Sequence, residues 1–135
     1  MDITAKKITV SVHFDPTQTS PEDQFSFSVD GGTFQSTVMI PVHREVGLVF
    51  FDLQTVNSEI SAEFPFDPIQ WFSEMQPIPK PPNFLVDRLA AQEVVIVDFN
   101  NAEMTFDFAV SIVHQGNTFT SDEPTIINTP ITGDS

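Results

Sequence analysis

Four carboxylates lie beside prolines, in stretches typical of loops or strand ends. They are Asp15, Asp67, Asp122 and Glu123. Loops at the ends of β-sandwich domains often hold Ca²⁺ through carboxylate and carbonyl oxygens, so these four are the candidate metal ligands. The same residues have a second interpretation, because an Asp in or before a turn accepts hydrogen bonds from nearby backbone N–H groups. Turn capping is the interpretation we favour, since no EF-hand spacing is present and nothing in the sequence brings the four loops together.

Catalytic chemistry has less support in the sequence. Serine, threonine and three histidines (His13, His43 and His114) are present, but no G-x-S-x-G elbow accompanies them. The chain has no cysteine, which excludes a thiolate nucleophile and a cysteine-based zinc site. We therefore predict no catalytic residue and no bound cofactor, and keep a loop-built hydrolase as an alternative function.

Carbohydrate binding is a further alternative, because sugars stack on aromatic side chains. The chain has one Trp and no Tyr, so the aromatic platform it offers is small. Trp71 is the best candidate anchor. A Ca²⁺- or carbohydrate-binding module that uses the end loops is thus an alternative function.

The charge of the chain argues against two classes of partner. Nineteen acids and five bases give a formal net charge of −14, which repels both nucleic-acid phosphates and anionic lipid. We expect neither nucleic acid nor a membrane as a partner. The first residues lack the apolar region of a signal peptide, which favours a cytoplasmic location.

The elements that must position these residues are strands. Apolar and polar residues alternate along many segments, which is typical of half-buried strands. The predicted strands are 6–14, 24–29, 33–40, 46–53, 58–66, 92–99, 103–114 and 125–128, with a hairpin turn at 30–32 and Pro41 ending the third segment. Short strands separated by turn signals predict one all-β domain over residues 1–135, an antiparallel immunoglobulin-like β-sandwich of seven to nine strands.

Residues 67–91 interrupt this pattern. Asp67 and Pro68 form a helix-start signal, with Asp as N-cap and Pro at the first helical position. Four prolines between 77 and 82 favour extended backbone, and 84–92 is short and ambiguous. The segment is predicted to be an irregular, Pro-rich crossover between the two sheets.

Two predicted strands, 46–53 and 92–99, are apolar on both faces. A two-layer sandwich normally shows polar residues on its solvent side, so these outer faces need a cover. We predict that the 67–91 segment covers part of them and that self-association covers the rest. The predicted function is a non-catalytic domain that binds or self-assembles, as a homo-oligomer built on an apolar sheet face.

The final segment, "SDEPTIINTP" (121–130), begins with acids and continues with β-branched residues. Pro124 lacks an N–H and suits the first residue of a strand or an edge position. Alternation then points Thr125 and Ile127 to one face and Ile126 to the other.

The sequence contains Asp-Pro at 15–16 and 67–68, Glu-Pro at 123–124 and the decapeptide 121–130. With these features it resembles the bacterial DP-EP family, whose name comes from such dipeptides. The chain is also distantly similar to the inclusion-body/AidA-type proteins, which end in a strand introduced by Asp-Pro-Thr. The resemblance implies a bacterial β-sandwich of unassigned function, and it transfers no catalytic residue.

Overall fold

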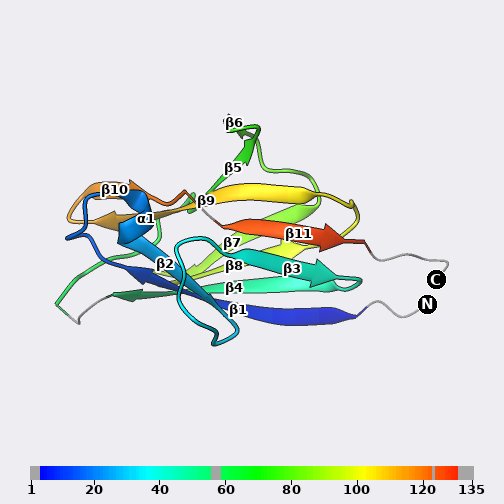
Figure 1. Ribbon diagram of the computed structural model, residues 1–135, viewed down its shortest axis with the longest axis horizontal. Coiled ribbons are helices and arrows are strands. Elements are labelled where there is room, and N and C mark those ends of the chain that lie inside the picture. Colours follow the sequence, from blue (N-terminus) through cyan, green and yellow to red (C-terminus); the bar gives the residue numbers. More distant parts are fainter. Residues whose placement is uncertain (1–3, 56–58, 123, 131–135) are drawn as a thin grey trace.

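The computed structural model describes residues 4–55, 59–122 and 124–130. Within them the chain forms two β-sheets that pack face to face around a hydrophobic core, with one short helix, α1 (Pro21–Gln24), near one end (Figure 1). The predicted all-β class is confirmed. In the described part of the chain, no helix is long and apolar enough to cross a membrane.

The first sheet has five strands and the second has six. Strands of the first sheet are β1 (Ala5–Phe14), β2 (Phe25–Val29), β4 (Val46–Thr55), β7 (Phe84–Ala90) and β8 (Glu93–Asp98), in the order β2-β1-β4-β8-β7. Strands of the second are β3 (Met39–His43), β5 (Ile69–Ser73), β6 (Gln76–Ile78), β9 (Thr105–His114), β10 (Asn117–Thr120) and β11 (Thr125–Thr129). Their order is β3-β11-β9-β5-β6, with β10 paired to β9.

Both sheets are mixed, so the prediction of an antiparallel sandwich is wrong. β1 pairs with β4 in parallel along ten residues, and β3 pairs with β11 in parallel. The path of the chain explains the first pair. After β2 turns back beside β1, the chain crosses to the second sheet as β3, and it returns along the other edge of β1 as β4, in the same direction as β1 (Figure 1).

The predicted strand count is also wrong, because the described residues contain eleven strands. Residues 67–91, predicted to be irregular, contain β5, β6 and β7. The Asp67–Pro68 helix signal is overridden by pairing: the carbonyl of Pro68 accepts from the Ser111 N–H at 2.8 Å, and β5 follows beside β9. Conversely, in the described part of 58–66, only an isolated bridge between Glu63 and Val113 forms.

The turn at 30–32 is confirmed, but its partner strand is displaced. Asp30 and Gly31 have positive φ angles of 50° and 79°, which glycine and Asp tolerate better than most residues. The next segment touches β2 only through one bridge, from Phe27 to Gln35. β3 then starts at Met39 in the other sheet and contains Pro41, which an edge strand accommodates.

Phenylalanine fills much of the core, as its abundance predicts. The fully buried rings are Phe14, Phe25, Phe27, Phe51, Phe64, Phe84 and Phe108. Rings from the two sheets meet directly: Phe51 of β4 lies edge-on to Phe108 of β9, with centroids 5.9 Å apart. Alternation along β1 is as predicted, because Ile8, Val10, Val12 and Phe14 all face this core.

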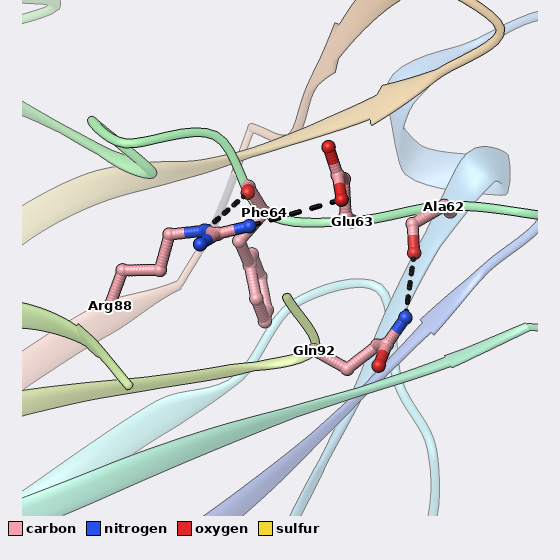
Figure 2. A network of polar contacts seen from close by, with 5 residues as sticks. All are labelled: Ala62, Glu63, Phe64, Arg88 and Gln92. Atoms are coloured by element: carbon pink, nitrogen blue, oxygen red, sulfur yellow. Dashed lines mark hydrogen bonds and ion pairs between the residues drawn. The ribbon is translucent and has the colours of Figure 1, made fainter. Parts of the chain in front are cut away.

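The segment 62–64 joins the two sheets along one side. Glu63 exchanges two backbone hydrogen bonds with Val113 of β9, at 2.8 and 3.1 Å. On the other side, Arg88 Nε of β7 donates to the Phe64 carbonyl at 2.8 Å, and Gln92 Nε2 donates to the Ala62 carbonyl at 3.3 Å (Figure 2). The buried Phe64 ring then fills the space between the sheets.

Truncation of Phe64 tests this bridging role. We expect Phe64→Ala to lower the free energy of unfolding by about 3–5 kcal/mol, because it removes a fully buried ring and leaves a cavity. Urea unfolding followed by fluorescence measures the change.

The neighbouring Glu63→Ala is the matched control. The Glu63 side chain is 57% exposed and lies 3.9 Å from Arg88. The variant should therefore lose less than about 1 kcal/mol of unfolding free energy. Equal losses in the two variants would contradict the assignment of the stabilising contact to the Phe64 ring.

Candidate functional site

Asp15 caps a turn. Its Oδ1 accepts hydrogen bonds from the Thr17 backbone N–H at 3.0 Å and from the Thr17 hydroxyl at 2.6 Å, and Oδ2 accepts from Gln18 Nε2 at 3.3 Å. These donors, the Thr17 hydroxyl first, hold the pKa of Asp15 below its usual value of 3.8. Asp15 thus makes the local hydrogen bonds of a turn cap, as the favoured interpretation of this residue predicts.

The other predicted ligands do not gather around Asp15. Asp67 lies before β5, in a shallow hollow with Lys80, whereas Asp122 lies between β10 and β11 and shares a hollow with Glu22 of α1. Glu123 lies outside the described residues. Across 4–55, 59–122 and 124–130, no group of three or more His, Asp or Glu side chains is placed to hold a metal ion.

The aromatic and imidazole candidates are occupied by packing. Trp71 is only 3% exposed and packs tilted against Phe84, with ring centroids 4.5 Å apart, so the predicted carbohydrate anchor is a core residue instead. His114 Nδ1 makes a 2.7 Å hydrogen bond with the Ser61 carbonyl, and His13 lies edge-on to Phe34. His43 is exposed and lies at the end of β3, which is an edge strand of the second sheet.

A cluster of buried polar side chains closes one end of the sandwich. This end cluster consists of Asp98 at the end of β8, Asn100 in the β8–β9 link and Asn128 in β11. Asp98 Oδ1 accepts from the Asn100 backbone N–H at 2.9 Å and from Asn128 Nδ2 at 3.0 Å. The second contact joins the first sheet to the second.

The Asn100 side chain extends this link to a third part of the chain. Its Nδ2, which carries two hydrogens, lies within hydrogen-bond distance of three carbonyls: those of Val42 at 3.3 Å, of Glu45 at 3.0 Å, and of Thr129. Val42 and Glu45 flank the crossing from β3 to β4. One amide group therefore holds together the carbonyls of the β3–β4 crossing and of β11.

Packing around the end cluster is tight. Gly47 of β4 faces Val42 and Asp98, and a Cβ atom at position 47 would lie 3.0 Å from Val42 Cγ1. A larger residue would require the Val42 side chain to move by a few tenths of an ångström, so glycine suits the close approach of β4 to this side chain.

The end cluster leaves three oxygens buried without a hydrogen-bond partner among the described residues: Asp98 Oδ2, Asn100 Oδ1 and Asn128 Oδ1. Burial raises the pKa of Asp98 above its usual value of 3.8, although the Asn100 N–H and the Asn128 amide act in the opposite direction. With one carboxylate and two amides, the cluster provides little of the negative charge that favours Ca²⁺ binding. Its evident role is to link the sheets.

The sequence carried a partial signal for this cluster. Val94, Ile96 and Asp98 share the inner face of β8, which places an ionisable residue at a core position. Asn100 has a positive φ of 52°, a backbone conformation that Asn tolerates better than most residues. The contact between Asp98 and Asn128 could not be read from periodicity, because it joins positions thirty residues apart.

The outer face of the first sheet carries a continuous apolar area, which we call the outer apolar face. Two cross-strand rows form it: Leu85, Val97 and Leu48 in one, and Val95 and Phe50 in the next, which ends at Asp87 on β7. Phe99 continues the alternation beyond β8 and is exposed, as is Leu85. The predicted apolar character of both faces of β4 and β8 is therefore present in the folded chain.

The 67–91 segment does not lie over the outer apolar face. Its strands β5 and β6 belong to the second sheet, and β7 extends the edge of the first sheet beside β8. Within the described residues, the polar side chains that border the face come from Asp87 in the middle of β7, from β1 and from the ends of the strands. Lys7 is one of them, with its Nζ 4.9 Å from the centroid of the Phe50 ring.

No family model matches this chain, and no curated protein matches it significantly. What the domain does must therefore be inferred from its own surfaces and from the end cluster.

Titration of Asp98 has a predictable effect on stability. Because its pKa is higher in the folded chain than in the unfolded chain, ionisation of Asp98 opposes folding. The penalty is absent below the usual pKa of 3.8 and develops as the pH rises through the folded-state pKa. Asp98→Asn removes this titration. We expect its free energy of unfolding, relative to wild type, to increase between about pH 4 and pH 7 in urea titrations.

Asp15→Asn is the control, because it removes the same charge from a carboxyl whose pKa is shifted downward. The stability that Asp15 contributes is present above pH 3.8 and is lost as the pH falls through its lowered pKa. Between about pH 4 and pH 7 the difference between this variant and wild type should stay constant. A constant difference for Asp98→Asn as well would contradict the buried ionisation.

Proposed function

We propose that this protein is a non-catalytic β-sandwich domain that self-associates through the outer apolar face of its first sheet. The observation that carries the proposal is a pair of apolar rows, one across β7, β8 and β4 and one across β8 and β4, with exposed Leu85 at the edge and exposed Phe99 beyond the end of β8. Water-facing strands in an antiparallel or mixed sheet normally carry polar residues, and large exposed apolar areas mark contact sites.

The dimensions of the sheet suit a symmetric dimer. Five strands of five to ten residues, about 4.8 Å apart and with about 3.3 Å per residue, give a face of roughly 600 Å². A standard protein interface buries about 600–1,000 Å² on each partner. Two copies related by a two-fold axis would bury the same apolar rows against each other, as isologous interfaces do.

Charge opposes this association in a predictable way. Each chain has a net charge of −14, so two copies repel each other at long range. Added salt screens this repulsion and leaves apolar burial intact. Dimer formation should consequently become stronger as the ionic strength increases, which is opposite to the behaviour of an interface built on ion pairs.

The finer classification is part of the same proposal. We assign the two packed sheets to an immunoglobulin-like architecture, modified by the parallel β1–β4 and β3–β11 pairs. Membership of the DP-EP family is supported by the Asp-Pro and Glu-Pro dipeptides at 15–16, 67–68 and 123–124. Neither assignment implies a catalytic activity.

Sedimentation velocity tests the dimer. We expect a reversible monomer–dimer equilibrium for wild type, and a dissociation constant at least about tenfold higher for the double variant Leu85→Ser/Phe99→Ser, because two exposed apolar contacts are lost. Phe66→Ser is the matched control, since this Phe is almost fully exposed but lies outside the outer apolar face.

Circular dichroism of all three proteins should be unchanged, because the substituted side chains are exposed. The proposal is wrong if wild type stays monomeric at millimolar concentration in high salt, or if Phe66→Ser weakens association as much as the double variant does.

A further inference from the structure

The second sheet has a groove on its outer face, beside the β5–β6 hairpin. Two hollows of about 470 and 450 Å³ adjoin there, and both are lined by Phe72 and Asp107. These two residues are cross-strand neighbours on β5 and β9. The hairpin stands away from the sheet at the top of Figure 1 and forms one wall. Together with residues 79–83 and 102–104, it defines what we call the hairpin groove.

The groove exposes methionine, which is normally among the buried residues. Met75 at the hairpin tip is 91% exposed, and Met104 at the opposite wall is 54% exposed. Met39 is 63% exposed and lies on the same outer face, since Met39, Thr125, Asp107 and Phe72 form one row across four strands. Methionine side chains are flexible and polarisable, which suits them to contact surfaces that adapt to a partner.

The backbone of the hairpin holds Met75 in this exposed position. Glu74 and Met75 both have positive φ angles, 51° and 66°, in a two-residue turn between β5 and β6. Such turns favour Asn-Gly, because residues with a larger side chain are strained there. A Gly at position 75 would be more stable than Met. Binding at the tip is a function that would account for a methionine at this strained position.

The charges around the groove identify the kind of partner. Glu74, Asp107 and Asp122 contribute carboxylates to the lining. Lys80 is the basic residue in the lining, and its Nζ donates to the Phe84 carbonyl at 2.6 Å. An apolar floor with an acidic border is complementary to a segment that carries both apolar and basic side chains. A second copy of this chain, with five bases against nineteen acids, does not match.

We propose that the hairpin groove binds a basic, amphipathic segment of another protein, with apolar side chains against Phe72, Met75 and Met104 and with Lys or Arg beside Glu74 and Asp122. This binding surface is on the side of the molecule opposite to the outer apolar face, so it is independent of the dimer. The net charge of −14 would also accelerate the approach of a basic partner.

Fluorescence anisotropy with a labelled Lys/Leu amphipathic peptide tests the groove. We expect saturable binding, and no binding of a Glu/Leu peptide of the same length. Met75→Ser and the double variant Glu74→Gln/Asp122→Asn should each weaken binding at least about tenfold. A Lys/Ser peptide, which has the charge without the apolar face, should compete poorly.

Two controls separate the groove from non-specific attraction to an acidic protein. Asp87→Asn/Glu93→Gln removes the same two charges from the first sheet, and Phe66→Ser removes an equally exposed apolar side chain; both should keep the wild-type affinity within about twofold. The proposal is overturned if the two charge variants lose affinity equally, if Met75→Ser has no effect, or if the Lys/Ser peptide binds as well. Sedimentation of Met75→Ser should give the wild-type monomer–dimer equilibrium, because this variant changes neither the net charge nor the outer apolar face.

Discussion

The hydrogen bonds of one buried amide determine how the two sheets meet at one end. Asn100 Nδ2 donates to carbonyls of the β3–β4 crossing and of β11, while its backbone N–H donates to Asp98, which also accepts from Asn128. Left unpaired in the interior, those carbonyls and amides would each cost about 1–3 kcal/mol. The cluster therefore favours one relative placement of β3, β4, β8 and β11 over any arrangement that leaves these groups without partners. Apolar packing alone, through contacts such as Phe51 with Phe108, is less directional.

The parallel pairs follow from the same constraint. β3 belongs to the second sheet and β4 to the first, and only a short crossing joins them. Arg44, in this crossing, has a positive φ of 56°, and its N–H donates to the Thr129 carbonyl. After the crossing, the Val46 N–H donates to the Thr4 carbonyl at 2.9 Å, and β4 begins beside the start of β1 and runs parallel to it. Gly47 then allows β4 to pass close to Val42. The end cluster therefore contacts the first residues of β4, which is the central strand of the first sheet and has apolar residues on both faces.

Periodicity in the sequence predicted which residues face inward, but not which strands are neighbours. Ile8 to Phe14, the turn at Asp30 and the burial of Ile126 all follow from local rules of side-chain direction and backbone conformation. The strand at 69–73 was missed because its helix-start signal is local, whereas the pairing of Trp71 with Phe108 is made with a residue far along the chain. Trp71 was misassigned as a possible binding residue for the same reason. Burial of a single aromatic residue depends on tertiary neighbours that alternation does not specify.

The two outer faces differ because their strands differ in position and length. On the first sheet, β4 and β8 lie in the interior of the sheet, and their outward side chains form an apolar area with acids such as Asp52 and Glu93 confined to one end. On the second sheet, the outward side chains of β9 and β11 include Thr105, Asp107 and Thr125, which separate the apolar residues beside the β5–β6 hairpin from Met39 at the other edge. A flat apolar face suits an identical face, whereas a narrow groove bordered by carboxylates requires a partner with positive charge. An acidic chain can therefore use one sheet for itself and the other for a basic partner, since neither surface satisfies the requirements of the other.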